Sequence, residues 1–166
     1  TGTYDKHREF VLTTSPSMDI LISSNLERLI YLICGEDSEK TKELMEELKT
    51  TGKYTITPEM KEKLADFAAG YSTEEETAES IHDTYQKTGY VMDTHTAVAA
   101  HVCGQYRAKS GDQTKCVIAS TASPYKFVKS VMSAIDAENA NADEFDLLPK
   151  LQEVSGVPMP QAIKDI

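Results

Sequence analysis

The fold class is decided by the stretch Lys115-Cys-Val-Ile-Ala-Ser-Thr-Ala-Ser-Pro-Tyr-Lys-Phe127. Its opening residues, Lys115–Ala119, include β-favouring Val and Ile and predict a short strand. Ser123 and Pro124 are residue types that start helices, and the apolar spacing of Phe127, Val131, Met132 and Ile135 predicts an amphipathic helix behind them. A strand that turns directly into a helix predicts an α/β protein.

Hydroxyl side chains occupy the turn between this strand and this helix. Where the carboxyl end of a strand meets the amino end of a helix, free backbone N–H groups and a positive partial charge favour ligand binding. Ser120 and Thr121 would point into that space. The alternative is structural, because Ser123 could simply cap the helix while the other two hydroxyls bond loop backbone. Spacing alone leaves both interpretations open.

A second junction of the same kind lies upstream. A strand at Tyr90–Met92, the loop Asp93-Thr-His-Thr96 and a buried helix at Ala97–Tyr106, closed by Gly111, are expected there. The histidine beside an aspartate could act as a general base. Alternatively, Thr94 or Thr96 only caps the helix.

The amino-terminal part predicts further alternation of short strands and helices. A strand at Glu9–Thr13 leads into a loop, Thr14–Asp19, and then into a helix that starts at the capping-box spacing Ser24-Asn-Leu-Glu27 and ends at Gly35. The remaining expected elements are helices at Ser38–Lys49, Pro58–Ala69, from the capping box Ser72–Glu75 to Gly89, and Phe145–Val154, with a strand at Lys53–Ile56. We therefore expect a helix-rich α/β chain with three to five short strands.

Composition excludes several classes of function. The 166 residues contain 17 basic and 27 acidic side chains, a net charge of −10 without a basic cluster, which argues against a nucleic-acid partner. The longest apolar runs are too short for a membrane span. Cys34, Cys103 and Cys116 are widely spaced, so we expect reduced, buried thiols in a cytoplasmic protein and no metal site.

Motifs for a self-sufficient active site are missing from the sequence. The eight glycines are dispersed, and none forms a phosphate-binding loop. We find no catalytic triad and no pair of catalytic carboxylates. From the residues alone, the chain is predicted to form one side of a ligand cleft in an α/β protein.

Three stretches in this order resemble a known family. They are Ser15-Pro-Ser-Met-Asp-Ile-Leu-Ile-Ser-Ser-Asn-Leu-Glu-Arg-Leu29, Asp93-Thr-His-Thr-Ala97 and Ala119-Ser-Thr-Ala-Ser-Pro-Tyr-Lys-Phe127. Together they resemble the carboxy-terminal part of the long, microbial and fungal form of threonine synthase. The start, Thr1-Gly-Thr-Tyr4, and the end, Ser155-Gly-Val-Pro-Met-Pro160, are similar to the same family.

This resemblance implies a fold, a cofactor and a reaction. The family has the tryptophan-synthase-β-like fold, fold type II, and uses pyridoxal phosphate. It converts O-phosphohomoserine and water to threonine and phosphate by β,γ-replacement. In this fold type a neutral hydroxyl meets the ring nitrogen of the cofactor, and the matching position is Thr121, with Ser120 as its neighbour.

The resemblance also implies a substrate cleft. Ser15, Asp19 and Asn25 are its candidates in the first motif, although Asn25 could be only an early-helix residue. Lys126 is a further candidate. Relatives often have histidine where Ser123 stands and a smaller residue at Tyr125, so surface packing and helix capping stay open for Lys126 and Ser123.

The expected role of the chain is that of one wall of a larger site. The family's Schiff-base lysine lies in a segment that we expect to precede Thr1, so residues 1–166 would be a single carboxy-terminal fragment that is inactive without the amino-terminal part of the enzyme. Two alternatives remain, namely a non-catalytic helical interaction module and a part of another fold-type-II lyase. The Ser-Pro-Ser-Met-Asp loop argues against the second.

Overall fold

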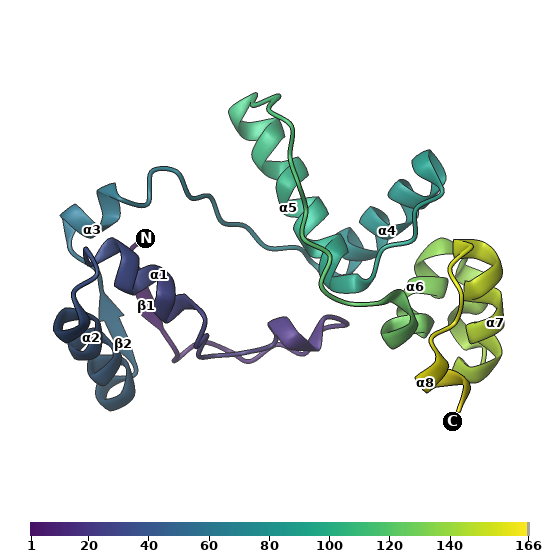
Figure 1. Cartoon of the computed structure of the whole chain (residues 1–166), viewed down its shortest axis with the longest axis horizontal. Helices are drawn as coiled ribbons and strands as arrows, with labels where there is room; N and C mark the ends of the chain where they lie inside the picture. The colour runs from purple at the N-terminus through teal and green to yellow at the C-terminus, as the bar shows by residue number, and fades with distance from the viewer. Residues whose placement is uncertain (166) are drawn as a thin grey trace. The chain divides into compact units, whose positions relative to one another are not determined.

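The computed structural model describes residues 1–165, which form two compact units. Unit 1 comprises Thr1–Leu12 and Ser17–Ala68, and unit 2 comprises Thr13–Pro16 and the chain from Ala69 onward. Figure 1 labels the helices and strands of both. Each unit has its own hydrophobic core, so each is described by itself.

Unit 1 contains a small antiparallel pair of strands. Strand β1 (Thr3–Asp5) pairs with β2 (Lys53–Thr55), with Tyr4 opposite Tyr54. These two rings stack with centroids 5.6 Å apart, which stabilises a sheet too short to persist by backbone pairing alone. The helices of this unit are α1 (Leu26–Ile33), α2 (Ser38–Thr51) and α3 (Pro58–Glu62), preceded by the 3-10 turn η1 (Pro16–Met18).

Apolar residues from these elements form the core of unit 1. Ile30 and Ile33 come from α1, Leu48 from α2, and Met60 from α3, with Tyr54 and Ile56 closing the cluster from the β2 side. Leu44 and Met45 pack against it from the same face of α2. The buried residues of α1 and α2 recur at helical spacing, so each helix buries one face.

The regular elements of unit 2 are all helices among its described residues. Its core contains Ile81, Val131 and Leu147, all at most 1% exposed, contributed by three different helices. Its elements are α4 (Glu74–Thr88), α5 (Thr94–Ser110), η2 (Pro124–Phe127), α6 (Val128–Ile135), η3 (Ala137–Asn141), α7 (Glu144–Ser155) and α8 (Gln161–Lys164).

Helix boundaries follow the sequence closely where glycine and capping residues are present. Helices α2, α4 and α5 end at Gly52, Gly89 and Gly111, each in the left-handed conformation that glycine adopts without strain. A capping box opens α4, but it joins Thr73 to Glu76, one residue later than expected from Ser72 and Glu75.

Three predicted strands are absent from the described residues. Glu9–Thr13, Tyr90–Met92 and Lys115–Ala119 have neither strand nor helix assignment, whereas the predicted strand at Lys53 is confirmed and β1 was not foreseen. A strand forms only when a neighbouring chain supplies hydrogen bonds, and propensity does not reveal that neighbour. Apolar side chains in two of these segments are exposed, since Leu12 is 78% and Val117 89% exposed.

Several helix predictions also needed correction. Helix α1 begins after Asn25, and no side chain caps it, so the capping box at Ser24 is wrong. The helix from Pro58 ends at Glu62, well before Ala69. Helix α5 is buried only over Thr94–Ala97, and its later small residues are half-buried or exposed, so the expected buried helix is wrong for most of its length.

The carboxy-terminal helices match expectation more closely. Helix α7 covers Glu144–Ser155 against an expected Phe145–Val154, and α2 covers Ser38–Thr51 against Ser38–Lys49. Within residues 1–165 no helix has the length and apolar character needed to cross a membrane.

Candidate functional site

A polar cluster of unit 2, which we name the α5 cluster, lies at the amino terminus of α5 and comprises Asp93, Thr94, His95, Thr96 and Ser120. Asp93 is only 1% exposed, and its Oδ1 accepts hydrogen bonds from the backbone N–H groups of His95 (2.9 Å) and Thr96 (3.2 Å). Its other carboxylate oxygen accepts from the Thr96 hydroxyl. Asp93 is therefore the cap of this helix, where a negative charge also meets the positive end of the helix dipole. Neither Thr94 nor Thr96 caps it.

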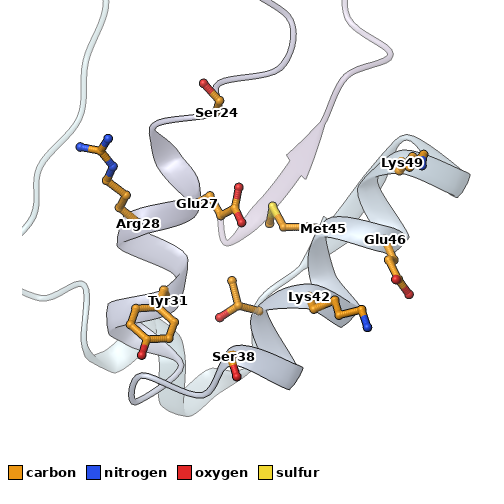
Figure 2. Close-up of a pocket in the computed structure, with 10 residues that line it drawn as sticks. Ser24, Glu27, Arg28, Tyr31, Ser38, Lys42, Met45, Glu46 and Lys49 are labelled. Atoms are coloured by element: carbon orange, nitrogen blue, oxygen red, sulfur yellow. The ribbon is translucent and has the colours of Figure 1, made fainter.

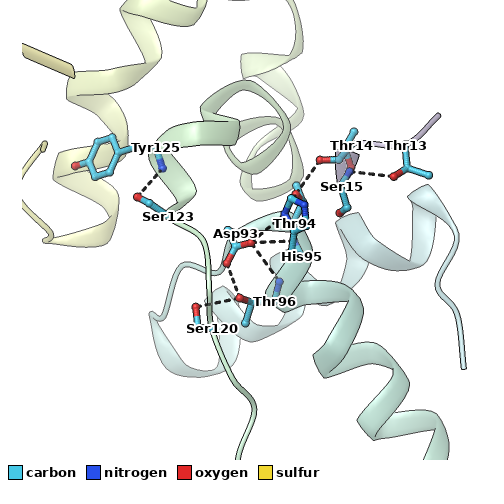
Figure 3. Close-up of polar contacts among 10 residues, drawn as sticks. All are labelled: Thr13, Thr14, Ser15, Asp93, Thr94, His95, Thr96, Ser120, Ser123 and Tyr125. Atoms are coloured by element: carbon cyan, nitrogen blue, oxygen red, sulfur yellow. Dashed lines mark hydrogen bonds and ion pairs between the residues drawn. The ribbon is translucent and has the colours of Figure 1, made fainter. Parts of the chain in front are cut away.

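A chain of hydroxyls connects this cap to Ser120, as Figure 3 shows. The Oγ atoms of Thr96 and Ser120 are 3.0 Å apart. The Thr96 hydroxyl is the donor both to the Asp93 carboxylate and to Ser120 Oγ, so its single hydrogen is shared between these two acceptors. Ser120 Oγ is the acceptor in this contact. The sequence did not reveal this contact, which joins residues 24 positions apart.

Thr121 has a different environment. Its side chain is exposed, and it makes no hydrogen bond with any residue of the 1–165 range that the structure describes. Two residues later, Ser123 Oγ accepts from the backbone N–H of Tyr125 at 3.3 Å, so the capping interpretation of Ser123 is confirmed. Thr121 thus presents a hydroxyl on the turn between Ser120, which is bonded to α5, and the cap of η2.

His95 lies beside the cap and is 7% exposed. Its ring packs on Phe127 with centroids 4.8 Å apart, and Nδ1 is 3.4 Å from both Asp93 Oδ1 and the Thr94 hydroxyl. The neighbouring carboxylate and the aromatic contact hold the imidazole in one orientation. From the sequence, His95 was predicted only as one candidate for a general base.

The loop that carries Ser15 is attached to the same helix end. The Thr94 hydroxyl donates to the Thr14 carbonyl at 2.8 Å, and the Thr14 N–H donates to Glu74 at 3.1 Å. Ser15 is 2% exposed, and its Oγ has no hydrogen-bond partner among the described residues. An unsatisfied buried hydroxyl is costly, so this oxygen is suited to a polar group that the chain does not itself provide.

The other predicted cleft residues lie apart from this cluster in the chain. Lys126 is exposed within η2, and Asn25 is exposed directly before α1. Asp19 and Asn25 belong to unit 1, whereas Ser15, Ser120, Thr121 and Lys126 belong to unit 2. Of the predicted site residues, the structure ties Ser15 and Ser120 to the α5 amino terminus, through Thr14 and Thr96 respectively.

Two cavities accompany these residues. In unit 1 a cavity of about 630 Å³ opens between α1 and α2, where Arg28, Tyr31, Lys42 and Glu46 line it (Figure 2). In unit 2 a cavity of about 410 Å³ is lined by Thr14, Thr94, Lys129 and Ser130, with other residues of α4 and α6. The second cavity reaches the Thr14–Thr94 contact but not Thr121.

Residues 112–122, which we name the return segment, run back along α5 in the opposite direction. Arg107 donates to the Thr114 carbonyl, Cys103 Sγ lies 3.2 Å from Cys116 Sγ, and Thr96 bonds Ser120. From one contact to the next, the residue number decreases on α5 and increases on the return segment, so the two stretches are antiparallel. Ser120 and Thr121 therefore owe their position to contacts with α5, and the strand expected there does not form.

Comparison with known proteins identifies a family and several relatives that this chain resembles. Residues 96–166 match the family described as threonine synthase, C-terminal. The chain is 35% identical over 164 residues to threonine synthase of Saccharomyces cerevisiae, and this alignment covers 90% of this chain and 32% of the relative. It is 36% identical over 160 residues to human threonine synthase-like 1, which covers 95% of this chain and 21% of that protein.

Two solved structures have the same fold. The yeast threonine synthase structure superposes with a TM-score of 0.75 at 33% identity, covering 95% of this chain and 34% of that one. The PLP-bound threonine synthase of Brucella melitensis has a TM-score of 0.72 at 39% identity, covering 81% and 28%.

The chain belongs to the threonine synthase family. It corresponds to a carboxy-terminal region of that family and has the fold of the matching part of these fold-type-II proteins. It spans between about a fifth and a third of the length of the curated relatives cited above. Its identity to the synthases and to the synthase-like proteins is nearly equal, so identity does not separate these two groups within the threonine synthase family.

Groups that could bind a metal ion are not assembled in the part of the chain that the structure describes. Across the described part, residues 1–165, no three His, Cys, Asp or Glu side chains are arranged as a metal site. The polar groups of the α5 cluster are instead hydroxyls, one imidazole and one buried carboxylate. Such a set suits an uncharged or weakly basic ligand atom.

Proposed function

We propose that the intact protein is a PLP-dependent threonine synthase, which converts O-phosphohomoserine and water to threonine and phosphate. The cofactor named for the Brucella melitensis structure and the family match support this reaction. The observation that carries the role of this chain is the exposed Thr121 hydroxyl, held on a turn by the Asp93–Thr96–Ser120 chain. We assign Thr121 to the ring nitrogen of the cofactor.

Thr121 is the hydroxyl of the pair that suits the cofactor nitrogen better. An unprotonated pyridine nitrogen accepts a hydrogen bond and therefore needs a donor. Ser120 Oγ is held against α5, where it accepts from the Thr96 hydroxyl, whereas Thr121 bonds no described residue. Thr121 retains its hydrogen, and the one carboxylate of the cluster, Asp93, is 1% exposed and already bonded to Thr96.

The contribution of this chain is orientation and electrostatics. When bound, pyridoxal phosphate supplies an electron sink for the reaction. Thr121 holds the ring nitrogen with a neutral donor, and Ser120 positions the turn from which Thr121 projects. The unsatisfied Ser15 hydroxyl is suited to a polar substrate atom, with Asp19, Asn25 and Lys126 as further candidates for the same role.

The catalytic lysine belongs, in this proposal, to polypeptide outside residues 1–166, together with the groups that anchor the cofactor phosphate. No lysine of this chain contacts the α5 cluster through a described hydrogen bond. The chain by itself should then release no phosphate from O-phosphohomoserine. The reaction takes place in the cytoplasm, where free thiols such as Cys34 and Cys116 are normally found.

The experiment compares Thr121 variants in the full protein that contains this chain. Thr121→Val removes the donor without changing the shape, and it should lower kcat/KM about a hundredfold, as the loss of one preorganised donor does. Thr121→Ser keeps the donor and should stay close to the parent. Thr121→Asp should alter the absorbance of bound cofactor by changing the protonation of its ring nitrogen.

The matched control is Ser123→Ala, which removes a helix cap two residues away and leaves the donor in place. This variant should cost stability but not change the cofactor spectrum. Unaltered turnover and absorbance in Thr121→Val would contradict the assignment. Phosphate release by residues 1–166 alone would contradict the placement of the lysine outside them.

A further inference from the structure

Two cysteines that are distant in the sequence touch each other on the surface of unit 2. Cys103 lies on α5 and is half-buried, and Cys116 lies on the return segment and is exposed. Their sulfur atoms are 3.2 Å apart, although 13 positions separate them in the chain. The expectation that the cysteines are buried is wrong, since Cys34 and Cys103 are half-buried and Cys116 is exposed. Cys34, in unit 1, has Met60 as its sulfur neighbour at 3.9 Å.

The contact is held by the fold on both sides. Arg107 bonds the Thr114 carbonyl one helical turn beyond Cys103, and Thr96 bonds Ser120 on the other side. Between Arg107 and Cys103 the helix advances about 6 Å, at roughly 1.5 Å a residue. Between Thr114 and Cys116 an extended chain advances about 6.6 Å. The two rises agree, so the register that pairs Arg107 with Thr114 also brings the two cysteines level.

We propose that Cys103 and Cys116 form a reversible intramolecular disulfide, which makes this pair a redox modification site. The sulfurs must approach from 3.2 Å to the bonded distance of about 2.05 Å. The exposed return segment can supply that movement, because it has no regular hydrogen-bonded structure of its own. In a reducing compartment such a bond is transient and senses oxidants.

Hydrogen peroxide is the oxidant class that completes the reaction. The Cys116 thiolate attacks one peroxide oxygen, the O–O bond breaks, and water leaves after proton uptake, which gives a sulfenic acid. The Cys103 sulfur then attacks the Cys116 sulfur, the S–O bond breaks, and a second water leaves with the Cys103 proton. Two thiols are oxidised and one peroxide is reduced to two waters.

The order of the two cysteines follows from their surroundings. The pKa of Cys103 is raised, chiefly because its thiol shares a hydrogen bond with Cys116 and secondarily because of burial, although the Arg107 charge opposes this. Cys103 therefore stays protonated while the exposed Cys116 meets the oxidant. The disulfide would fix the return segment to α5 covalently, whatever the activity of the intact protein.

The test uses the full protein that contains this chain, treated with equimolar hydrogen peroxide, followed by alkylation of remaining thiols and trypsin. Cleavage after Lys87, Arg107, Lys115 and Lys126 leaves Cys103 and Cys116 on separate peptides, so a linked pair appears as one mass. We expect the Cys103–Cys116 link to form roughly tenfold faster or more in the native chain than in concentrated urea, because contact makes the step intramolecular. Dithiothreitol should reverse it.

Two variants serve as controls. Cys34→Ser should leave the link unchanged, whereas Arg107→Gln should slow it by releasing the return segment from α5. In Cys103→Ser, no link between Cys34 and Cys116 should form at a comparable rate. The proposal is overturned if folding gives no advantage over urea, if Cys34 pairs with Cys116 as fast, or if both thiols end as separate oxidised or alkylated residues.

Discussion

At the scale of single residues, Asp93 does more than its position in the sequence indicates. One buried carboxylate accepts from two backbone N–H groups and from the Thr96 hydroxyl, and the Thr96 oxygen in turn contacts Ser120 Oγ. A single side chain therefore links a helix end to the turn that carries Thr121. Removing it should disturb both.

Asp93→Ala is the variant that separates this linkage from ordinary capping. It should lower the free energy of unfolding by about 2–4 kcal/mol, because the loss of a helix cap adds to one buried hydroxyl, that of Thr96, left without its carboxylate acceptor. Urea denaturation of the chain, followed by circular dichroism, measures this change.

The matched control is Asp143→Ala. Asp143 also caps a helix, accepting from Phe145 N–H at 2.9 Å, but it is exposed and bonds no further side chain through a described contact. Its loss should cost only about 1 kcal/mol. Equal costs for the two substitutions would show that the hydroxyl chain behind Asp93 contributes nothing.

Some residue-level predictions from sequence were right where the interaction is local. Ser123 is two positions from the N–H that it accepts, so its spacing already offered the cap as one of two interpretations, whereas the capping box at Ser24 was wrong. The Thr96–Ser120 contact crosses 24 positions and the Cys103–Cys116 contact crosses 13, and no local pattern encodes either. The roles given to Thr121 and Ser15 remain proposals, since they concern groups outside the chain.

At the scale of elements, α4 shows how a helix start responds to pH. Glu76 accepts from the Thr73 N–H at 2.7 Å while the Thr73 hydroxyl accepts from the Glu76 N–H, and His101 lies 3.5 Å from the carboxylate. The backbone hydrogen bond to Thr73 is the main reason why the pKa of Glu76 lies below its ordinary value. The charged form is thus preferred in the folded state.

The sign of the pH effect follows from that direction. A carboxyl whose pKa is lower in the folded state contributes stability above its unfolded pKa, about 4.3, and loses it as the pH falls through the folded value. We expect the wild-type start of α4 to weaken in that acidic range, while Glu76→Gln shows no such step at this site. Carboxyl-detected titration by NMR measures it, and a Glu76 midpoint at or above the ordinary value would contradict it.

Helices were predicted better than strands for a physical reason. A helix satisfies its backbone from within, and its caps lie a few residues from the bonds that they complete, as at Gly111 and Thr73. The segments Glu9–Thr13 and Lys115–Ala119 have strand-forming residues but no strand neighbour among the residues described. Strand β1 was missed because the partner that makes Thr3–Asp5 a strand lies 48 or more positions away.

At the scale of the whole molecule, the chain has two hydrophobic cores, one in each unit. Ile33 represents the core of unit 1 and Leu147 that of unit 2, and both are at most 2% exposed. Truncating either should lower the stability of its own core by about 2–5 kcal/mol, through lost burial and the cavity left behind.

Leu147→Ala and Ile33→Ala are therefore a matched pair for a test of independence. We expect Leu147→Ala to accelerate amide hydrogen exchange in α6 and α7 while α1 and α2 keep their rates, and Ile33→Ala to do the reverse. Exchange measured by mass spectrometry on peptides of each unit gives the answer. Acceleration of both units by either substitution would mean that the chain unfolds as one cooperative body.

Helix α5 and the return segment rise by different amounts per residue. The helix advances about 1.5 Å a residue and an extended chain about 3.3 Å. Their side chains therefore come level at only a few places, of which Arg107–Thr114, Cys103–Cys116 and Thr96–Ser120 are three. Deleting one residue between Cys116 and Ser120 would shift Ser120 along α5 by the rise of one extended residue, about 3.3 Å, and turn its side chain to the opposite side of the segment. The length of this short stretch is therefore as constrained as the identity of its hydroxyls.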